Sequence, residues 1–360
     1  MNTTLILELT NLCNLNCVMC ELPDTECQKG FIRLELVEKI LKDLKEHMLH
    51  FNLILPFWAG ESSLHPQFGN IIKLIFKYNH DHALADGLGI DTNLNALGKN
   101  DIDLILSENQ FVVIHFSLDA ASESTYNKIR RGGDFQKALS NAEYFLKKRE
   151  ENDMKYPHFV FQFIVMEENY EEIKEFVDFW SQRLDKAGKD FQINYFYDKP
   201  APITKDTIFI RRCDAPNGKT SLQIKYDNLH KKAVKSILGE EYSEYLTNEF
   251  REDEKGNNIY TGSKEREVCA GPFTHLSIKF DGRVTLCCQD TEAELAIGDV
   301  NKESIADIWY GEKAEKLRKQ HISGDLPERC ANCFNQIYPL INREKCYKIM
   351  KNFKKWDKHD

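Results

Sequence analysis

Three cysteines near the amino terminus constrain this chain more than any other feature. Cys13, Cys17 and Cys20 have the spacing Cys-x3-Cys-x2-Cys and follow an apolar run at residues 5–9. A strand that ends in a short loop can turn three thiolates toward one point. On a four-iron cluster, three thiolates leave one iron without a protein ligand. An open metal position of this kind can bind and activate a small molecule.

The other interpretation of three close cysteines is a structural zinc site. Zinc in such sites takes four ligands and favours Cys-x2-Cys pairs. The loop offers no fourth Cys or His, apart from Cys27 further along the chain. The spacing therefore favours iron and sulfur over zinc.

The composition is that of a soluble globular protein with room for one large domain and a smaller one. The net charge of −9 argues against broad nucleic-acid binding, which requires a basic face. No apolar run is long enough to span a membrane. Glu8 and Asn11 interrupt the first apolar stretch, so no secretion signal is predicted. Eleven cysteines without such a signal predict a cytoplasmic protein whose clustered cysteines bind metal.

Apolar residues alternate between strand-like and helix-like spacing along the first half of the chain. Strands are predicted at residues 1–9, 51–58, 88–92, 111–118, 159–166 and 191–196. Helices are predicted between them, at 34–44, from Pro66 onward, 102–106, 135–148 and 167–184. This alternation is typical of βαβ units and a parallel sheet. The predicted fold class is α/β, a partial (β/α)6 barrel with its chemistry at the carboxyl ends of the strands.

Short polar motifs follow three of the predicted strands. They are Trp58-Ala59-Gly60-Glu61-Ser62, Thr92-Asn93 and Ser117-Leu118-Asp119. A further stretch, Tyr126-Asn127-Lys128-Ile129-Arg130-Arg131-Gly132-Gly133, comes soon afterwards. A Gly-Glu pair alone is typical of a turn, and Ser-Leu-Asp alone is typical of a helix cap. These motifs indicate a functional site because they recur at the ends of successive strands that follow the cysteines in the chain.

Together these features resemble the radical S-adenosylmethionine (SAM) enzymes, over about residues 3–197. The resemblance implies a [4Fe–4S] cluster on Cys13, Cys17 and Cys20 whose open iron chelates the amino and carboxylate groups of SAM. It also implies that the reduced cluster splits SAM into methionine and a 5′-deoxyadenosyl radical, which abstracts a hydrogen from the substrate. The electron donor would be a protein such as flavodoxin or ferredoxin.

The resemblance assigns SAM-binding roles to residues of these motifs. The predicted SAM-binding residues are Met19, Gly60, Glu61, Asn93, Ser117, Asp119 and Arg130. Gly60 and Glu61 would hold the amino group, although Ala59 and Ser62 depart from the family's Gly-Gly-Glu-Pro pattern. The Arg130 guanidinium suits a bidentate grip on the SAM carboxylate. Met19 would contact adenine, whereas a buried Met is otherwise a core residue.

A second set of cysteines lies in the last ninety residues. Cys269 precedes a predicted hairpin with an Asp281-Gly282 turn, and Cys287 lies at its return end. Cys330 and Cys333 follow a predicted helix. Four thiolates suit zinc and a fully ligated [4Fe–4S] cluster equally well. Neighbouring strand residues point to opposite faces, so only one of Cys287 and Cys288 is expected to ligate, and the spacing favours Cys287.

Placed after a radical SAM core, this second set resembles the twitch domain, the shortened relative of the SPASM extension. It implies one auxiliary [4Fe–4S] cluster on Cys269, Cys287, Cys330 and Cys333. The predicted domains are a barrel at 1–198, a connector or substrate-facing insertion at 199–267, a small α+β cluster domain at 268–340 and a basic tail at 341–360. Within the connector, Arg211 and Arg212 are interpreted as a solvated surface pair, with binding of an acidic substrate group as the alternative.

The resemblance also indicates a reaction. A fully ligated auxiliary cluster cannot bind substrate without losing a ligand, so electron transfer is its expected task. We expect oxidation of a carbon that bears a hydroxyl to a carbonyl, in a sugar, aminocyclitol or similar polar metabolite. One alternative is epimerisation or crosslinking of a ribosomally made peptide, which is weakened because the chain starts directly at the first barrel strand. A non-catalytic zinc-binding scaffold is the other alternative.

Overall fold

The computed structural model describes residues 3–22, 27–195, 204–215, 220–239, 250–252, 258–260, 268–331, 333 and 340–353. One ten-stranded sheet organises the fold, in the order β15-β14-β13-β1-β3-β4-β5-β7-β9-β8. Its strands are β1 (Thr4–Leu7), β3 (Phe51–Leu55), β4 (Ala85–Thr92), β5 (Phe111–Ser117), β7 (His158–Val165), β8 (Phe191–Asn194), β9 (Asp206–Arg212), β13 (His275–Ile278), β14 (Arg283–Thr285) and β15 (Gly298–Asp299). Every pairing from β13 to β8 is parallel, and only the pairings of β14 are antiparallel.

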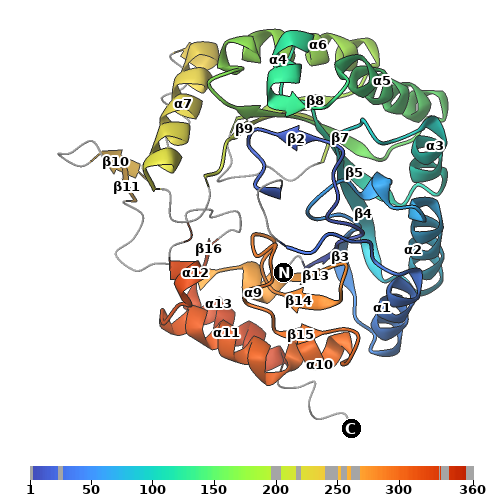
Figure 1. The fold of residues 1–360 in the computed structure, drawn as a ribbon, viewed down its shortest axis with the longest axis vertical. Coiled ribbons are helices and arrows are strands. Elements are labelled where there is room, and N and C mark those ends of the chain that lie inside the picture. The colour runs from blue at the N-terminus through green and yellow to red at the C-terminus, as the bar shows by residue number, and fades with distance from the viewer. Residues whose placement is uncertain are drawn as a thin grey trace.

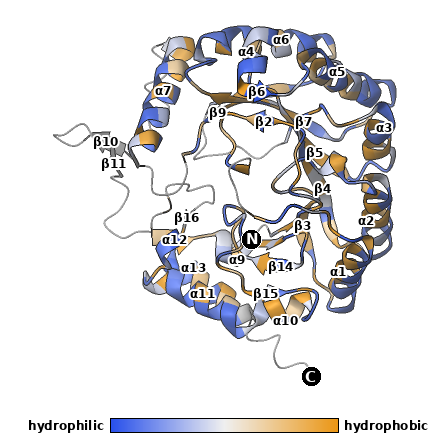
Figure 2. Cartoon of the chain, viewed as in Figure 1, coloured by the Kyte–Doolittle hydropathy of each residue, from blue (hydrophilic) through white to orange (hydrophobic). Residues whose placement is uncertain are grey.

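Helices cover the outer face of the strands from β1 to β9. Figure 1 shows them as an arc around the strands, and Figure 2 shows hydrophobic colour along the strands and on their helices. They are α1 (Leu34–Glu46), α2 (Phe68–His82), α3 (Lys99–Ser107), α4 (Glu123–Ile129), α5 (Phe135–Glu151), α6 (Ile173–Lys186) and α7 (Thr220–Leu238). The predicted α/β fold, a partial barrel followed by a small C-terminal domain, is confirmed.

Aromatic contacts identify which face of each strand meets the helices. The Phe116 ring on β5 lies 5.3 Å from the Phe145 ring on α5, and the Phe161 ring on β7 stacks 4.2 Å from the Trp180 ring on α6. Because side chains alternate along a strand, the neighbouring residues His115 and Gln162 face the interior of the barrel. The outer face is therefore an apolar core, whereas the interior face carries polar groups.

One predicted boundary does not coincide with the structure. Residues 199–267 were expected to form a connector, but β9 lies within this range and pairs parallel with β7 on one side and β8 on the other. The alternation of buried Ile208 and Ile210 is strand-like, yet Pro200 and Pro202 before it indicated the end of the barrel. The connector therefore begins after Arg212. The remaining described strands of this range are β10 (Phe250–Glu252) and β11 (Asn258–Tyr260), which pair with each other.

The C-terminal strands β13, β14 and β15 continue the barrel sheet, and two further strands form a sheet of their own. The remaining helices are α9 (Gly271–Thr274), α10 (Ile305–Tyr310), α11 (Glu312–Ser323), α12 (Glu328–Ala331) and α13 (Arg343–Phe353). β12 (Val268–Cys269) pairs with β16 (Leu340–Ile341), and Cys346 and Met350 of α13 pack against Val268 and Phe273. The first half of the expected basic tail is thus part of this domain, while residues 354–360 lie outside the described residues.

A buried ion pair holds β9 in the barrel, and its loss should destabilise the fold. Arg149 donates from Nη1 and Nη2 to the two carboxylate oxygens of Asp206, at 2.7 and 2.6 Å, and the Phe159 N–H also donates to Asp206. We expect Asp206→Asn to lower the free energy of unfolding by about 3–5 kcal/mol, because it leaves a buried cation uncompensated. Chemical denaturation under anaerobic conditions measures this.

The matched control is the exposed pair Lys205–Asp190, at 3.2 Å with 34% and 83% of the side chains exposed. Asp190→Asn should change stability by less than about 1 kcal/mol. Equal effects of the two substitutions would contradict a role for Asp206 in fixing β9.

Candidate functional site at the strand ends

The loop that carries the first three cysteines is anchored on two sides. Cys17 lies in β2 (Asn16–Cys17), which pairs antiparallel with β6 (Arg130–Arg131). The Val18 N–H donates to the Ile129 carbonyl at 3.0 Å. On the other side, the Glu61 N–H donates to the Leu12 carbonyl at 2.8 Å. The predicted Gly-Glu and Arg motifs therefore lie against the cysteine loop itself.

Gly60 is required by this packing. Its φ is +86°, and a Cβ added there would lie 2.5 Å from the Leu12 carbonyl oxygen and 2.9 Å from the Thr10 carbonyl oxygen. Only glycine tolerates both this backbone conformation and this closeness. Gly60 and Glu61 therefore hold the segment that follows β3 against the cysteine loop.

Burial keeps the first two thiols protonated in the absence of a metal. It raises the pKa of Cys13 to about 11, with smaller increases from the charges of Glu61, Cys17 and Cys20, so these three thiols lie near one another. Burial also raises the pKa of Cys17, while the Arg130 guanidinium lowers it. Two side-chain donors face these sulfurs: Asn93 Nδ2 lies 3.8 Å from Cys13 Sγ, and Arg130 Nη1 lies 3.6 Å from Cys17 Sγ.

Arg130 is buried and paired with Asp119. Its Nε donates to Asp119 Oδ2 at 2.8 Å, and its Nη2 makes a second contact with the same oxygen. Asp119 has a φ of +60° at the end of β5, and its Oδ1 accepts the Ile164 N–H of β7 at 2.7 Å. A guanidinium has five N–H donors, of which these contacts and Cys17 use three. One N–H on each Nη is left for a further acceptor.

Glu61 and Asn93 form a second buried polar group beside the cysteine loop. Glu61 accepts the Asn93 N–H at 2.8 Å and the hydroxyls of Ser63 and Thr92 at 2.7 and 3.1 Å. Burial raises the pKa of Glu61, and these donors oppose it. Asn93 Nδ2 also donates to Asn14 Oδ1 at 3.0 Å. The strand ends of β3 and β4 are thereby joined to the loop.

The other two predicted SAM-binding residues lie at the rim of this group. Met19 packs with Ile129, Met166 and Cys213 in a small apolar cluster beyond the ends of β7 and β9. Ser117 is the last residue of β5, and its hydroxyl makes no hydrogen bond within the described part of the chain. The structure thus brings six of the seven residues into contact with the loop or its immediate partners and leaves Ser117 beside them.

The second cysteine set also converges. Burial raises the pKa of Cys269 to about 12, with further increases from the charges of Cys333, Cys330 and Cys288. Burial likewise raises the pKa of Cys287, with contributions from Cys288, Cys269 and Cys333. The expectation that Cys287 and Cys288 point apart does not apply, because β14 ends at Thr285 and both residues lie beyond it. Strand alternation therefore does not decide between Cys287 and Cys288.

Several residues that the sequence analysis did not single out position this second set. Asp290 is fully buried, accepts the Thr285 hydroxyl at 2.9 Å and lies 3.4 Å from Arg329 Nε. Arg329 also donates to the Gln289 carbonyl at 2.7 Å, so it joins the helix of Cys330 to the loop of Cys287. An aspartate three residues after a cysteine and an arginine directly before one were the available signals in the sequence.

Two contacts tie the second set to the barrel. Trp58 Nε1, just before Gly60, donates to the Cys288 carbonyl at 2.6 Å. Glu8, after β1, lies 3.7 Å from Lys279, after β13, and both side chains are buried. The Lys279 ammonium also bonds the Thr291 carbonyl and lies 5.5 Å from the centre of the Trp58 ring. These contacts therefore join the second cysteine set to the barrel.

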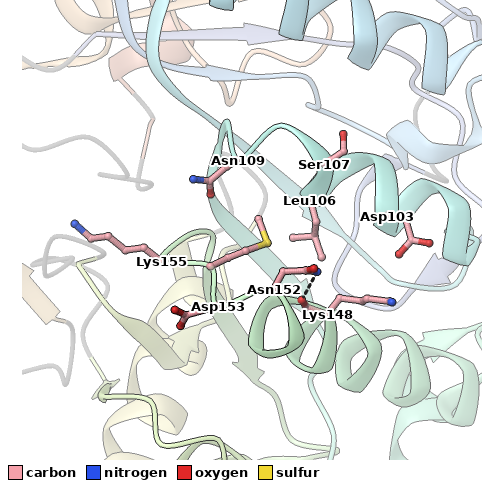
Figure 3. A pocket seen from close by; sticks show the side chains of 9 residues that line it. Asp103, Leu106, Ser107, Asn109, Lys148, Asn152, Asp153 and Lys155 are labelled. Carbon is pink, nitrogen blue, oxygen red and sulfur yellow. Dashed lines mark hydrogen bonds between the residues drawn. The ribbon is translucent and has the colours of Figure 1, made fainter.

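A separate surface hollow lies away from both cysteine sets. Figure 3 shows this hollow of about 680 Å³ at the carboxyl ends of α3 and α5, lined by Asp103, Lys148, Asp153 and Lys155 among others. These helix ends lead into the amino ends of β5 and β7. Barrels of this type carry their chemistry at the opposite edge, so the hollow is not the candidate site.

Comparison with known proteins agrees with this geometry. The radical SAM superfamily matches residues 7–179, and SPASM, an iron–sulfur cluster-binding domain, matches residues 269–334. The tungsten-containing aldehyde ferredoxin oxidoreductase cofactor-modifying protein of Pyrococcus furiosus is 28% identical over 331 residues, which cover 86% of this chain and 81% of that protein. The S-adenosyl-L-methionine-dependent 2-deoxy-scyllo-inosamine dehydrogenase of Niallia circulans is 28% identical over 81 residues, 22% of this chain and 32% of that protein.

The fold has a close structural counterpart as well. A solved structure of native anSMEcpe, with bound AdoMet and Cp18Cys peptide, has a TM-score of 0.59 and 17% sequence identity, and the match covers 98% of this chain and 97% of that chain. A partial parallel barrel with thiols at its strand ends and a second thiol set beside it defines a cluster-dependent enzyme. The chain is a radical SAM enzyme with a C-terminal SPASM-like iron–sulfur domain.

The donor sets fit the cofactors of that family, a SAM-binding [4Fe–4S] cluster and an auxiliary iron–sulfur cluster. Thiols predominate at both sites, and amide and guanidinium donors face two of the sulfurs, as cluster thiolates require. Among the described residues, no three Cys, His, Asp or Glu side chains already surround a single-ion site. That Cys13, Cys17 and Cys20 hold the first cluster, and that Cys269, Cys330, Cys333 and one of Cys287 and Cys288 hold the second, remains our prediction. No described helix could span a membrane.

Replacing Gly60 should disturb the cysteine loop. The Cβ of Gly60→Ala would overlap the Leu12 carbonyl, and a positive φ costs an alanine about 1–3 kcal/mol. We expect loss of cluster iron and of SAM binding, measured by iron analysis and by equilibrium binding of SAM. Gly69→Ala is the matched control, because Gly69 lies in α2 and its added Cβ would meet nothing closer than 3.5 Å. A Gly60→Ala protein with normal iron content and SAM affinity would contradict this account.

Arg130 and Arg131 allow a test with neighbouring residues of one strand. Arg130 is buried beside Cys17, whereas Arg131 is exposed. We expect Arg130→Ala to weaken SAM binding at least about tenfold, the equivalent of one lost charge-assisted hydrogen bond, while Arg131→Ala leaves it unchanged. Iron content of each variant separates a loss of SAM binding from a loss of the cluster. If Arg131→Ala weakened SAM binding more than Arg130→Ala, Arg131 would be the residue that binds the SAM carboxylate.

Proposed function

We propose that this radical SAM enzyme oxidises a hydroxyl-bearing carbon of a sugar, aminocyclitol or similar polar small molecule to a carbonyl. When bound, the first cluster supplies the electron that cleaves SAM to a 5′-deoxyadenosyl radical, and the auxiliary cluster supplies an electron acceptor. The resemblance implies flavodoxin or ferredoxin as the electron donor.

The observation that carries this proposal is the attachment of the second cysteine set to the barrel. Trp58 connects the strand end that bears Gly60 to the Cys288 carbonyl, and Lys279 connects β13 to the Thr291 carbonyl of the same loop. An acceptor held by these thiols would form part of the wall of the chamber in which a C–H bond is attacked. A redox-neutral reaction has no need of such an acceptor, whereas an oxidation does.

The residues at the strand ends have positioning roles in this proposal. Arg130 offers one N–H on each Nη to the carboxylate of SAM, while Asp119 keeps the guanidinium in place. Glu61 and Asn93 hold the adjoining side of the loop. The apolar cluster of Met19, Met166 and Cys213 offers a surface on which adenine can pack.

The names of the relatives support a small-molecule substrate. The Pyrococcus furiosus protein is named for modification of a cofactor, and the Niallia circulans protein for dehydrogenation of an aminocyclitol. The structural counterpart was solved with a peptide. At 17% identity this similarity supports the fold alone. Peptide modification is therefore treated as one result that the experiment below could give.

Removing the second cysteine set should separate SAM cleavage from substrate oxidation. We expect a variant with Ala at positions 269, 287, 288, 330 and 333 to keep slow, uncoupled formation of 5′-deoxyadenosine, because the first three cysteines lie in the barrel loop. Formation of oxidised product should be lost. The comparison variant, with Ala at 13, 17 and 20, should lose about four irons per chain and all SAM cleavage.

Circular dichroism and retained iron show whether the five-cysteine variant is folded, since metal sites often hold their domain together. Normal turnover of substrate by a folded variant would contradict the proposal. So would modification of a peptide without any net oxidation, because a redox-neutral reaction such as epimerisation would then be the activity.

A further inference from the structure

Two polar side chains face each other on the interior surface of the barrel, apart from both cysteine sets. Asp91 on β4 and His115 on β5 are register partners, and His115 Nδ1 lies 3.7 Å from Asp91 Oδ1. They lie in the middle of the sheet, yet 41% of the Asp91 side chain and 24% of the His115 side chain are exposed. Side chains this accessible on central strands line a solvent-filled interior.

The strand alternation confirms which way the pair points. Ile90 and Phe116 are buried in the core that meets the helices, so Asp91 and His115 face the opposite side. His115 precedes Ser117 by two residues on the same face, which places it about 6–7 Å deeper in the barrel at the ordinary rise of a strand. The pair therefore lies just beneath the strand ends that carry the candidate SAM site.

The hydrogen-bonding capacity of this pair is unused. Within the described part of the chain, no donor bonds the Asp91 carboxylate, and neither ring nitrogen of His115 makes a hydrogen bond. Glu61 and Asp119, two carboxylates near the strand ends, each accept two or more donors. Water can satisfy these groups at their present exposure, and a ligand that supplies hydroxyl or amine donors could replace that water.

The charges around the pair favour a neutral or cationic ligand. Arg211 on β9 approaches from the same face, but it donates to Asp214 at 2.7 Å and to Gln162 on β7 at 3.4 Å. Arg212 also pairs with Asp214, at 3.3 Å, so the interpretation of these arginines as a solvated surface pair was wrong. The barrel wall surrounds Asp91, so burial raises its pKa, and the positive charges of His115 and Arg211 lower it.

We propose that Asp91 and His115 form the site that binds the hydroxyl under oxidation, in a substrate that is a polyol or an aminocyclitol, with His115 as the acceptor of its proton. This inference rests on the proposed oxidation. The substrate carbon loses one hydrogen atom to the 5′-deoxyadenosyl radical, which becomes 5′-deoxyadenosine. The hydroxyl proton passes to His115, and one electron passes to the auxiliary cluster, so the C–OH becomes C=O. Asp91 faces Nδ1 and would stabilise the imidazolium that forms.

The molecule contains a matched control pair. His50 and Asp86 also form a His–Asp pair, with Nε2 and Oδ1 at 2.9 Å, but they lie at the amino ends of the sheet with 47% and 59% of their side chains exposed. The test variants are Asp91→Asn and His115→Gln, and the controls are Asp86→Asn and His50→Gln. The probe is 2-deoxy-scyllo-inosamine, the aminocyclitol in the name of one relative.

The first measurement is binding of this probe to the cluster-loaded enzyme with SAM, before any reductant is added, so that it does not depend on turnover. We expect Asp91→Asn to weaken binding by about tenfold or more, as for loss of a hydrogen bond to a charged group. After reduction, His115→Gln should lower formation of ketone by about 10²–10⁴-fold, with probe affinity nearly unchanged, as for loss of a general base. Both variants should still form 5′-deoxyadenosine without substrate, and both controls should match the unmodified enzyme.

The outcomes separate this inference from the proposed function. If the unmodified enzyme oxidises the probe and the Asp91 and His115 variants behave like the controls, the pair has no role and the oxidation stands. If the unmodified enzyme neither binds nor oxidises this probe or any other polyol, both proposals are overturned. If His115→Gln loses probe binding and turnover together, His115 binds substrate but is not the proton acceptor.

Discussion

The parallel pairing of β13 with β1 is the constraint on which both cysteine sets depend. β1 pairs with β3 on one side and with β13 on the other, so the C-terminal domain shares the first strand of the barrel. Cys13 follows β1, whereas Cys269 precedes β13, and Cys287 follows the antiparallel β14. Cys13 therefore follows the carboxyl end of this pair of strands, whereas Cys269 lies before its amino end. A shift in the register of this pair would move them relative to each other, so a single pairing determines the geometry of the whole enzyme.

The Glu8–Lys279 pair explains how that register is maintained. Buried ion pairs contribute little to stability, because desolvation offsets their attraction, and apolar residues of similar volume often serve as well. Burial raises the pKa of Glu8, its Oε1 has no hydrogen-bond partner among the described residues, and its Oε2 accepts the Phe280 N–H at 3.1 Å. Glu8 follows β1 and Lys279 follows β13, so this contact forms in the register observed between the two strands. Its value lies in alignment of the two domains, and the exposed fraction of about 1% on Lys279 leaves no role for solvent.

Local patterns were sufficient to predict the barrel, because each strand and helix is specified by its own apolar spacing. The same is true of the motifs at the strand ends, which lie near one another as soon as the strands are parallel. Contacts between distant residues were not predictable: Trp58 and the Cys288 carbonyl are separated by 230 positions, and Arg130 and Cys17 by 113. The position of β9 between β7 and β8 was not predictable either. The order of strands in a sheet depends on how the chain connects them, and the local apolar spacing does not reveal this. Likewise, two adjacent arginines do not reveal that Asp214 pairs with both of them and that Asp227 also pairs with Arg212.

The charge balance at the first site follows from these distant contacts. A cluster ligand must be a thiolate, yet burial disfavours the charged form of both Cys13 and Cys17. At Cys17 the Arg130 guanidinium offsets this cost, and Asp119 fixes that guanidinium in turn. At Cys13 the charge of Glu61 has the same sign as the thiolate, and the Leu15 N–H and the Asn93 amide are the described donors that face this sulfur. The iron of a bound cluster would supply the positive charge that stabilises the Cys13 thiolate.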